Sequence, residues 1–172
     1  MDFLEFATQR YSVRKFLDKH LEKDVIDKII KAGHVAPTGC NNQPQRILVI
    51  NSDESIEKLK NCTRSHFGCP SAILVCYNKD ESWVRKYDGE MSAPYDAAIV
   101  TTHMMLMAHQ LGVGVTWVMH FNPFKIIEEF NLPENYVPCA ILMMGYPAPD
   151  AEPIDMHFNK RDIDEVVFYD SF

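Results

Sequence analysis

Arg10-Tyr11-Ser12-Val13-Arg14 is the first of two polar segments that decide the fold of this chain, and the second is Ala36-Pro37-Thr38-Gly39-Cys40-Asn41-Asn42-Gln43-Pro44. Two arginines and a hydroxyl within five residues can converge on a phosphate, because a guanidinium presents paired planar donors to an oxyanion. The second segment offers backbone and amide groups that can hydrogen-bond the edge of a flat heterocycle. Together the two segments predict a site for a phosphorylated ring.

Each feature also has an ordinary explanation. A run such as Arg-x-Ser-x-Arg often forms a solvated turn, and a loop of proline, glycine and asparagine can simply end a helix. Later in the chain, Trp117 is typical of a buried strand residue and Arg161 of a surface charge. Their joint order along one chain is what favours a ligand site.

The composition limits the classes of protein to which the chain can belong. Its 172 residues predict one domain, residues 1–172, which can bury about 70% of the surface that its unfolded form exposes. The apolar fraction of 47% and the charged fraction of 24% are typical of a globular protein. A net charge of −7 argues against a nucleic-acid partner, which needs a dense basic face. Residues 97–111 are too few and too polar to span a bilayer, so no membrane partner is expected.

The cysteine and histidine patterns favour no metal site. Five cysteines, an odd number without a signal peptide, predict reduced thiols and a cytoplasmic protein. Cys62, Cys69 and Cys76 are spaced evenly by seven, whereas zinc sites use close pairs, and Cys76 lies in an apolar run. We therefore interpret these three as buried structural thiols. The seven histidines show no convincing ligand spacing.

Hydrophobic periodicity predicts helices and strands in alternation. Helices are expected around residues 3–7, 25–30, 56–59, 95–111 and 123–130, and strands at 46–50, 72–77, 115–118, 137–144 and 166–169. Gly112 and Gly114 begin a G-x-G, but Trp117 occupies the third glycine position of a dinucleotide-binding motif and the pair follows a helix. Gly112 is better explained as a left-handed helix C-cap.

Three segments indicate either a lid or contact with a second copy of the chain. Residues 78–92 are polar, aromatic and irregular, and we interpret them as a lid. The helix at 95–111 is apolar on almost every face and must be covered all round, which a dimer achieves more easily. The chain from Pro147 to Asp155 is proline-rich and acidic, and it leads to the strand pattern at 166–169. A strand on such an arm can pair with a neighbour's sheet edge.

In these motifs the chain resembles the nitroreductase family of FMN-dependent oxidoreductases. The family's signatures are Arg-x-Ser-x-Arg and Ala-Pro-Ser-x-x-Asn-x-Gln-Pro, and Thr38 stands here in place of the serine. The likeness continues from Tyr95 to Trp117 and ends at Gly145-Tyr146-Pro147 and Lys160-Arg161. It implies an α+β, nitroreductase-like fold with a central, mostly antiparallel sheet flanked by helices. It also implies a homodimer that exchanges its C-terminal strand and holds FMN at the subunit interface.

The resemblance assigns roles to individual residues. Arg10, Ser12 and Arg161 form the expected phosphate set. Arg14 reaches the flavin pyrimidine, where a fixed cation stabilises the reduced ring. The expected cofactor-binding residues are Arg10, Tyr11, Ser12, Arg14, Pro37, Thr38, Gly39, Asn41, Gln43, Val118, Met119, Lys160 and Arg161.

Within the second segment the roles divide between the two chains of the implied dimer. Asn41 and Gln43 would hydrogen-bond the edge of the ring or the ribityl hydroxyls, and Pro37 and Thr38 would approach from the partner chain. Gln45 replaces the tryptophan that usually follows Gln-Pro, which bears on packing near the loop.

The chain departs from the family after Trp117, where Met119 and His120 replace small glycines. In the family this strand end lies beside the reactive N5 of the flavin, so bulky residues there narrow the substrate face. His120 is a candidate for substrate contact or proton delivery, since histidine titrates near physiological pH, and a solvent-facing loop histidine is the equal alternative. Trp83 and Tyr87 of the lid are further substrate candidates, although surface aromatics often only pack a loop.

The expected activity is a two-step oxidoreduction in which no amino-acid side chain need be a nucleophile. NADH or NADPH gives a hydride to flavin N5, and an electron-poor acceptor, a nitro compound or a quinone, then takes the electrons. Two alternatives remain open at this point: other flavin chemistry on the same fold, such as reductive dehalogenation or cleavage of the flavin, and a non-catalytic FMN-binding electron carrier. A structural domain without a cofactor is a third.

Overall fold

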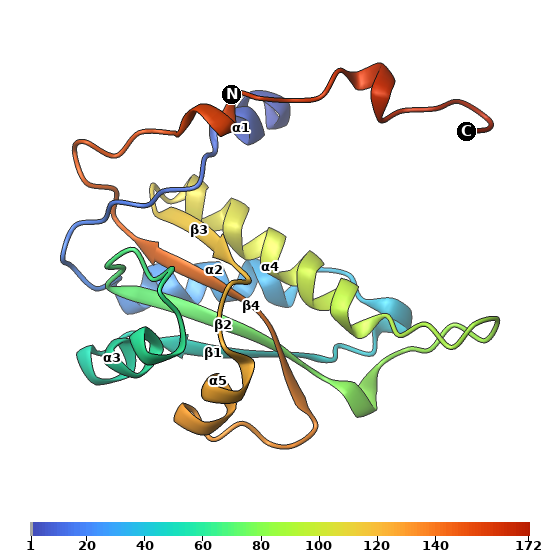
Figure 1. Ribbon diagram of the computed structural model, residues 1–172, viewed down its shortest axis with the longest axis horizontal. Coiled ribbons are helices and arrows are strands. Elements are labelled where there is room, and N and C mark those ends of the chain that lie inside the picture. Colours follow the sequence, from blue (N-terminus) through green and yellow to red (C-terminus); the bar gives the residue numbers. More distant parts are fainter. Residues whose placement is uncertain (1) are drawn as a thin grey trace.

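This computed structural model describes residues 2–172 and shows a four-stranded sheet with helices on both faces (Figure 1). The strands run in the order β1-β2-β4-β3, and every neighbouring pair is antiparallel. The elements are α1 (Phe3–Gln9), α2 (Lys23–His34), β1 (Gln45–Ile50), α3 (Asp53–Cys62), β2 (Ser71–Asn78), α4 (Ala93–Gln110), β3 (Gly114–Val118), α5 (Pro123–Glu129) and β4 (Tyr136–Gly145). The predicted α+β fold with an antiparallel sheet is confirmed.

Alternation along β2 divides the hydrophobic core between the two faces of the sheet. Ile73 and Val75 pack in the cluster that includes α2 and α4. Ala72, Leu74 and Cys76 pack in the cluster that includes α3 and α5. Both faces of β2 are therefore buried, as a continuous apolar run predicts.

Helix α4 crosses one face of the sheet and ends as predicted. Gly112 has a φ of 74°, and the Val113 N–H donates to the Ala108 carbonyl at 2.9 Å, which closes the helix with a left-handed cap. One side of the helix stays open within one chain: Tyr95 is 59% exposed and Ile99 38%. The covering that an apolar helix requires is therefore incomplete in a single protomer.

The predicted strand at residues 166–169 is wrong for this chain taken alone. A 3₁₀ turn at Ile163–Glu165 precedes these residues, and no strand follows it. The side chains from Val166 to Tyr169 are all exposed. A strand needs an edge with which to pair. The extended arm, residues 156–172, meets none within the described chain (Figure 1).

Residues 78–92 are more regular than the sequence predicted. A 3₁₀ turn at Lys79–Glu81 leads into a hairpin in which Val84 pairs with Met91. The Arg85 N–H donates to the Glu90 carbonyl at 2.9 Å. This hairpin extends beyond the end of the sheet in Figure 1.

The three evenly spaced cysteines are buried, as predicted. Cys62, Cys69 and Cys76 are 3%, 2% and 3% exposed. Burial raises the pKa of the Cys62 and Cys69 thiols to about 11 and that of Cys76 to about 12, so all three are protonated at neutral pH. Within residues 2–172, no helix has the length and apolar character needed to cross a bilayer.

Candidate functional site

The segment from Arg10 to Arg14 is held against the outer edge of β3. Helix α1 ends at Gln9, so Arg10 is its C-cap. The Val13 N–H donates to the Val115 carbonyl at 3.1 Å, and the Thr116 hydroxyl donates to the Val13 carbonyl. A Cβ at Gly114 would lie 2.8 Å from the Val13 side chain, so this approach of the two backbones requires glycine. Pairing with β3 therefore fixes the backbone between Arg10 and Arg14.

Arg10 is a half-buried cation that has no carboxylate partner among the described residues. No aspartate or glutamate of residues 2–172 lies within ion-pair distance of its guanidinium. Burial lowers the pKa of Arg10, because desolvation disfavours its charge. It lines a cavity of about 210 Å³ together with Tyr11, His109 and residues 112–115. An anion entering this cavity would offset the cost of burying Arg10.

Arg14 lies in a different environment from Arg10. Its Nη1 donates to the Ser12 carbonyl at 3.1 Å, and its guanidinium carbon is 5.8 Å from the centre of the Phe67 ring. Phe67 has a φ of 53°, which is uncommon for a bulky residue and typical of functional sites. Nothing in the sequence indicated a role for Phe67 beyond the glycine at position 68, which is a general turn signal.

The loop from Thr38 to Gln43 has an unusual backbone. Cys40, Asn41 and Gln43 have φ values of 49°, 57° and 52°, in the left-handed region that non-glycine residues rarely occupy. The Gln43 N–H donates to the Thr38 hydroxyl at 3.1 Å. The side chains of Asn41 and Gln43 are exposed and accessible to a ligand, and Gln43 Nε2 donates to the Asn41 carbonyl at 3.4 Å.

The end of β3 is open, with two side chains at its rim. Val118 is buried, whereas Met119 is 68% exposed and His120 is also exposed. The Thr63 hydroxyl donates to the His120 carbonyl at 2.6 Å, and the Ser65 hydroxyl lies 3.4 Å from His120 Nδ1. The backbone of His120 is therefore fixed. Ser65 is a ring partner that the sequence analysis did not single out.

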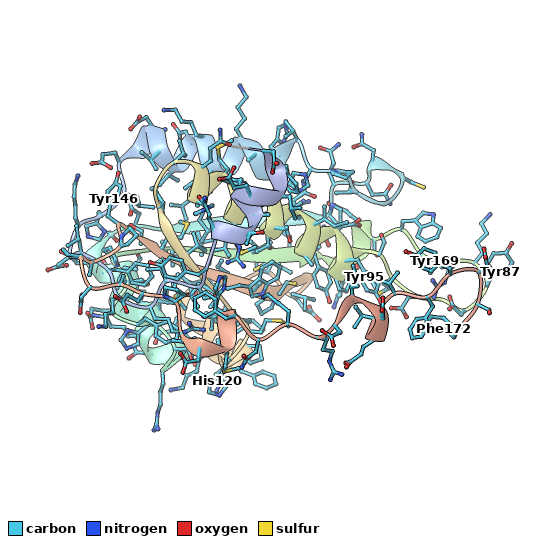
Figure 2. All side chains as sticks on the ribbon, turned by 90° about the horizontal axis from the view of Figure 1, so that it is seen from above. Tyr87, Tyr95, His120, Tyr146, Tyr169 and Phe172 are labelled. Carbon is cyan, nitrogen blue, oxygen red and sulfur yellow. The ribbon has the colours of Figure 1, made fainter. Side chains whose placement is uncertain are left out.

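One chain does not bring all the predicted residues together. Lys160 and Arg161 lie on the arm, where Arg161 is exposed and its Nη1 is 3.5 Å from Glu165 Oε2. Tyr87 is 98% exposed on the hairpin, and Figure 2 shows it far from His120. Gly39, which follows Pro37 and Thr38, packs against Ser92 and donates its N–H to Asp96 of α4. Within residues 2–172, these side chains therefore do not form a single site.

Comparisons with known proteins agree on one family. A family model described as "Nitroreductase family" matches residues 7–68 and 64–146. A Methanothermobacter thermautotrophicus protein with the provisional name NADH dehydrogenase/NAD(P)H nitroreductase is 30% identical over 157 residues, which are 86% of this chain and 78% of that protein.

Solved structures give the same result. A nitroreductase family protein from Clostridium difficile 630 superposes with a TM-score of 0.94 at 42% identity, over 100% of both chains. A Desulfovibrio desulfuricans protein, provisionally described as a nitroreductase and solved in complex with FMN, has a TM-score of 0.76 at 26% identity, over 98% of this chain and 96% of its own.

Proposed function

This chain belongs to the nitroreductase family, and from that premise we propose that it is an FMN-dependent NAD(P)H oxidoreductase whose acceptor is an electron-poor nitro compound or quinone. The observation that carries the proposal is Arg10, a half-buried guanidinium without a carboxylate partner in the described chain. The FMN complex of the Desulfovibrio desulfuricans relative and the NAD(P)H nitroreductase name of the Methanothermobacter relative support the choice of cofactor and reductant.

The donor set fits a flavin phosphate. A phosphomonoester carries about −1.5 to −2 charges near neutral pH, so a chain with a net charge of −7 must neutralise it locally. We assign Arg10 and Ser12 of the segment beside β3 to the phosphate, with Lys160 and Arg161 of an arm. The long ion pair of Arg161 with Glu165 is exposed and contributes about 1 kcal/mol or less, so a phosphate can displace it.

The remaining residues suit the ring. When bound, FMN accepts a hydride from NADH or NADPH and passes electrons to the acceptor. Arg14 provides a fixed positive charge for the pyrimidine end, which stabilises negative charge there. The exposed amides of Asn41 and Gln43 bind polar atoms at the edge of the ring. Met119 and His120 border the face where the acceptor binds, with His120 as a candidate proton donor.

We further propose that two copies of the single domain, residues 1–172, assemble with the site between them. The arm itself carries exposed apolar side chains: Phe168, Tyr169 and Phe172 are 53%, 86% and 106% exposed. The outer edge of β1 pairs with no strand of residues 2–172, whereas residues 12 and 13 occupy the outer edge of β3. The edge of β1 is therefore available to residues 166–169 of a second copy.

The phosphate assignment is tested by removing two cations. Arg10→Ala combined with Arg161→Ala should yield mainly protein without flavin, because the phosphate loses two charge-assisted partners. A matched control is Lys28→Ala with Lys58→Ala, which removes two positive charges from exposed helix surfaces. Full retention of the yellow cofactor in the first variant would refute the assignment.

The reaction class is tested anaerobically. NADH or NADPH is added to the protein with FMN, and nitro compounds and quinones are then screened for reoxidation of the flavin. We expect rapid bleaching by a pyridine nucleotide followed by reoxidation by at least one acceptor. A flavin that dithionite reduces but both nucleotides leave unchanged would instead identify an electron carrier.

A further inference from the structure

A buried carboxylate lies where the loop 38–43, the hairpin and helix α4 meet. Asp96, in the first turn of α4, is only 3% exposed. Its Oδ1 accepts a hydrogen bond from the Gly39 N–H at 2.8 Å, and its Oδ2 accepts one from the Ser92 hydroxyl at 2.8 Å. None of the roles proposed above uses this side chain.

The loop packs directly against the start of α4 and the base of the hairpin. A Cβ at Gly39 would lie 2.7 Å from Ser92 Oγ and 3.4 Å from Trp83 Cβ, so a larger residue would force the Ser92 side chain to move. The Ser92 N–H donates to the Trp83 carbonyl at 2.9 Å, and the Ala93 N–H donates to the Ser82 hydroxyl at 3.0 Å. Both ends of the hairpin are therefore anchored within a few residues of Asp96.

The loop needs such an anchor. Its left-handed residues, Cys40, Asn41 and Gln43, are strained, and strained residues persist only where surrounding contacts hold them. No cationic side chain of the described chain is within ion-pair distance of Asp96, so its two hydrogen bonds and the nearby helix N-terminus stabilise the buried carboxylate. Neutral apolar groups of similar size would pack here at lower desolvation cost, which argues for a positional role.

We infer that Asp96 is a positioning residue that holds the loop 38–43 and the hairpin in one fixed relation. Through the Gly39 N–H it sets the strained backbone that presents Asn41 and Gln43, and through Ser92 it fixes the base of the hairpin that carries Trp83. Its effect on the cofactor rests on the proposed function. Its effect on the loop does not, and the two are measured separately.

The test compares three variants with a matched control. Asp96→Ala removes both acceptors, whereas Asp96→Asn keeps an oxygen for Gly39 and offers an N–H to Ser92 Oγ. Ser92→Ala removes one of the two donors. The control is Thr101→Ala, because Thr101 is also fully buried on α4 but its hydroxyl donates to the Ala97 carbonyl of the same helix.

The first readout is amide hydrogen exchange of the loop without FMN. We expect exchange at Gly39 and Gln43 to be at least about tenfold faster in Asp96→Ala, since a hydrogen bond to a charged acceptor is lost. Ser92→Ala should give a smaller increase, and Asp96→Asn should stay within about threefold of the native chain. Thr101→Ala should leave the loop unchanged.

The second readout is FMN affinity with the full-length variants. The Kd for FMN should rise about tenfold in Asp96→Ala and return close to the native value in Asp96→Asn. The inference is overturned if Asp96→Ala leaves loop exchange and FMN affinity unchanged, or if Thr101→Ala alters them equally. Should Asp96→Ala not fold, unchanged exchange at Gly39 in Ser92→Ala overturns it. A native chain that binds no FMN would contradict the proposed function, and loop exchange would still decide the role of Asp96.

Discussion

The body of this chain and its C-terminal arm both carry large apolar side chains, but only the body buries them. Leu142 on β4 is fully buried between strands and helices. Phe168, in the apolar run of residues 166–169 on the arm, is 53% exposed, and Phe172 is 106% exposed. In Figure 1 the chain leaves the body after β4, passes α1 and ends well beyond it.

The difference shows what a sequence pattern needs in order to become structure. An apolar run forms a strand in the body because neighbouring strands pair with it and helices cover it. The same kind of run on the arm has neither, because the chain that would supply them is a second copy under our proposal. Substitutions of buried residues in the body are therefore expected to change unfolding, and substitutions of exposed residues on the arm are expected to change association.

The largest expected effect separates the two regions by stability. Leu142→Ala should lower the free energy of unfolding by about 2–5 kcal/mol, since it leaves a cavity in the core. Phe168→Ala should lower the stability of the isolated protomer by less than about 0.5 kcal/mol. Urea unfolding at several protein concentrations measures both. Equal losses for the two variants at low concentration would contradict the distinction between body and arm.

The second effect concerns association. Deletion of the residues after Asp155 removes the exposed apolar side chains from Met156 to Phe172 and the cations Lys160 and Arg161. We expect the shortened chain to sediment mainly as a monomer and to keep its helix content by circular dichroism. An unchanged sedimentation profile would rule out the exchanged arm.

The third effect compares one arginine of the body with one of the arm. Arg10→Ala should raise the Kd for FMN by about tenfold to a hundredfold, because a half-buried charge-assisted hydrogen bond is lost. Arg161→Ala should have a smaller effect, since the neighbouring Lys160, which is assigned to the same phosphate, remains. Flavin fluorescence titration measures both constants. A greater loss for Arg161 than for Arg10 would move the phosphate site towards the arm.

The smallest effect is on the pH dependence of stability. Burial and the charge of Arg10 lower the pKa of His109, whose ring lies 4.8 Å from that of Phe6. The unfolded chain, with an ordinary histidine pKa of about 6.5, therefore binds the proton more readily, and stability should fall as the pH drops below that value. His109→Gln should make the urea midpoint depend less on pH below pH 6.5. If the urea midpoint of His109→Gln depended on pH as steeply as that of the native chain, groups other than His109 would dominate the pH dependence of stability.

Local patterns in the sequence predicted the body well. The helices expected around residues 56–59 and 123–130 form as α3 and α5, where Ser52 caps the first and Pro123 opens the second, and Gly112 adopts the expected left-handed cap conformation. Each of these follows from the chemistry of a few neighbouring residues, which is present in the sequence itself.

The features that the sequence did not predict depend on contacts between distant residues. Asp96 reads as one polar position in an apolar helix, and only the fold brings its carboxylate to Gly39. The left-handed backbone of Cys40 and Gln43 has no signature in residue type. The strand expected at 166–169 fails in one chain because β-propensity does not supply a partner edge.

The most direct test of the account is analytical ultracentrifugation of the protein with FMN, monitored at a protein wavelength and at a flavin wavelength. We expect one boundary with the mass of two chains, in which the flavin absorbance moves with the protein at about one FMN per chain, as a phosphate and ring site between two copies requires. A protein boundary that carries no flavin absorbance even with excess FMN, or a flavin-loaded boundary with the mass of one chain, would contradict it.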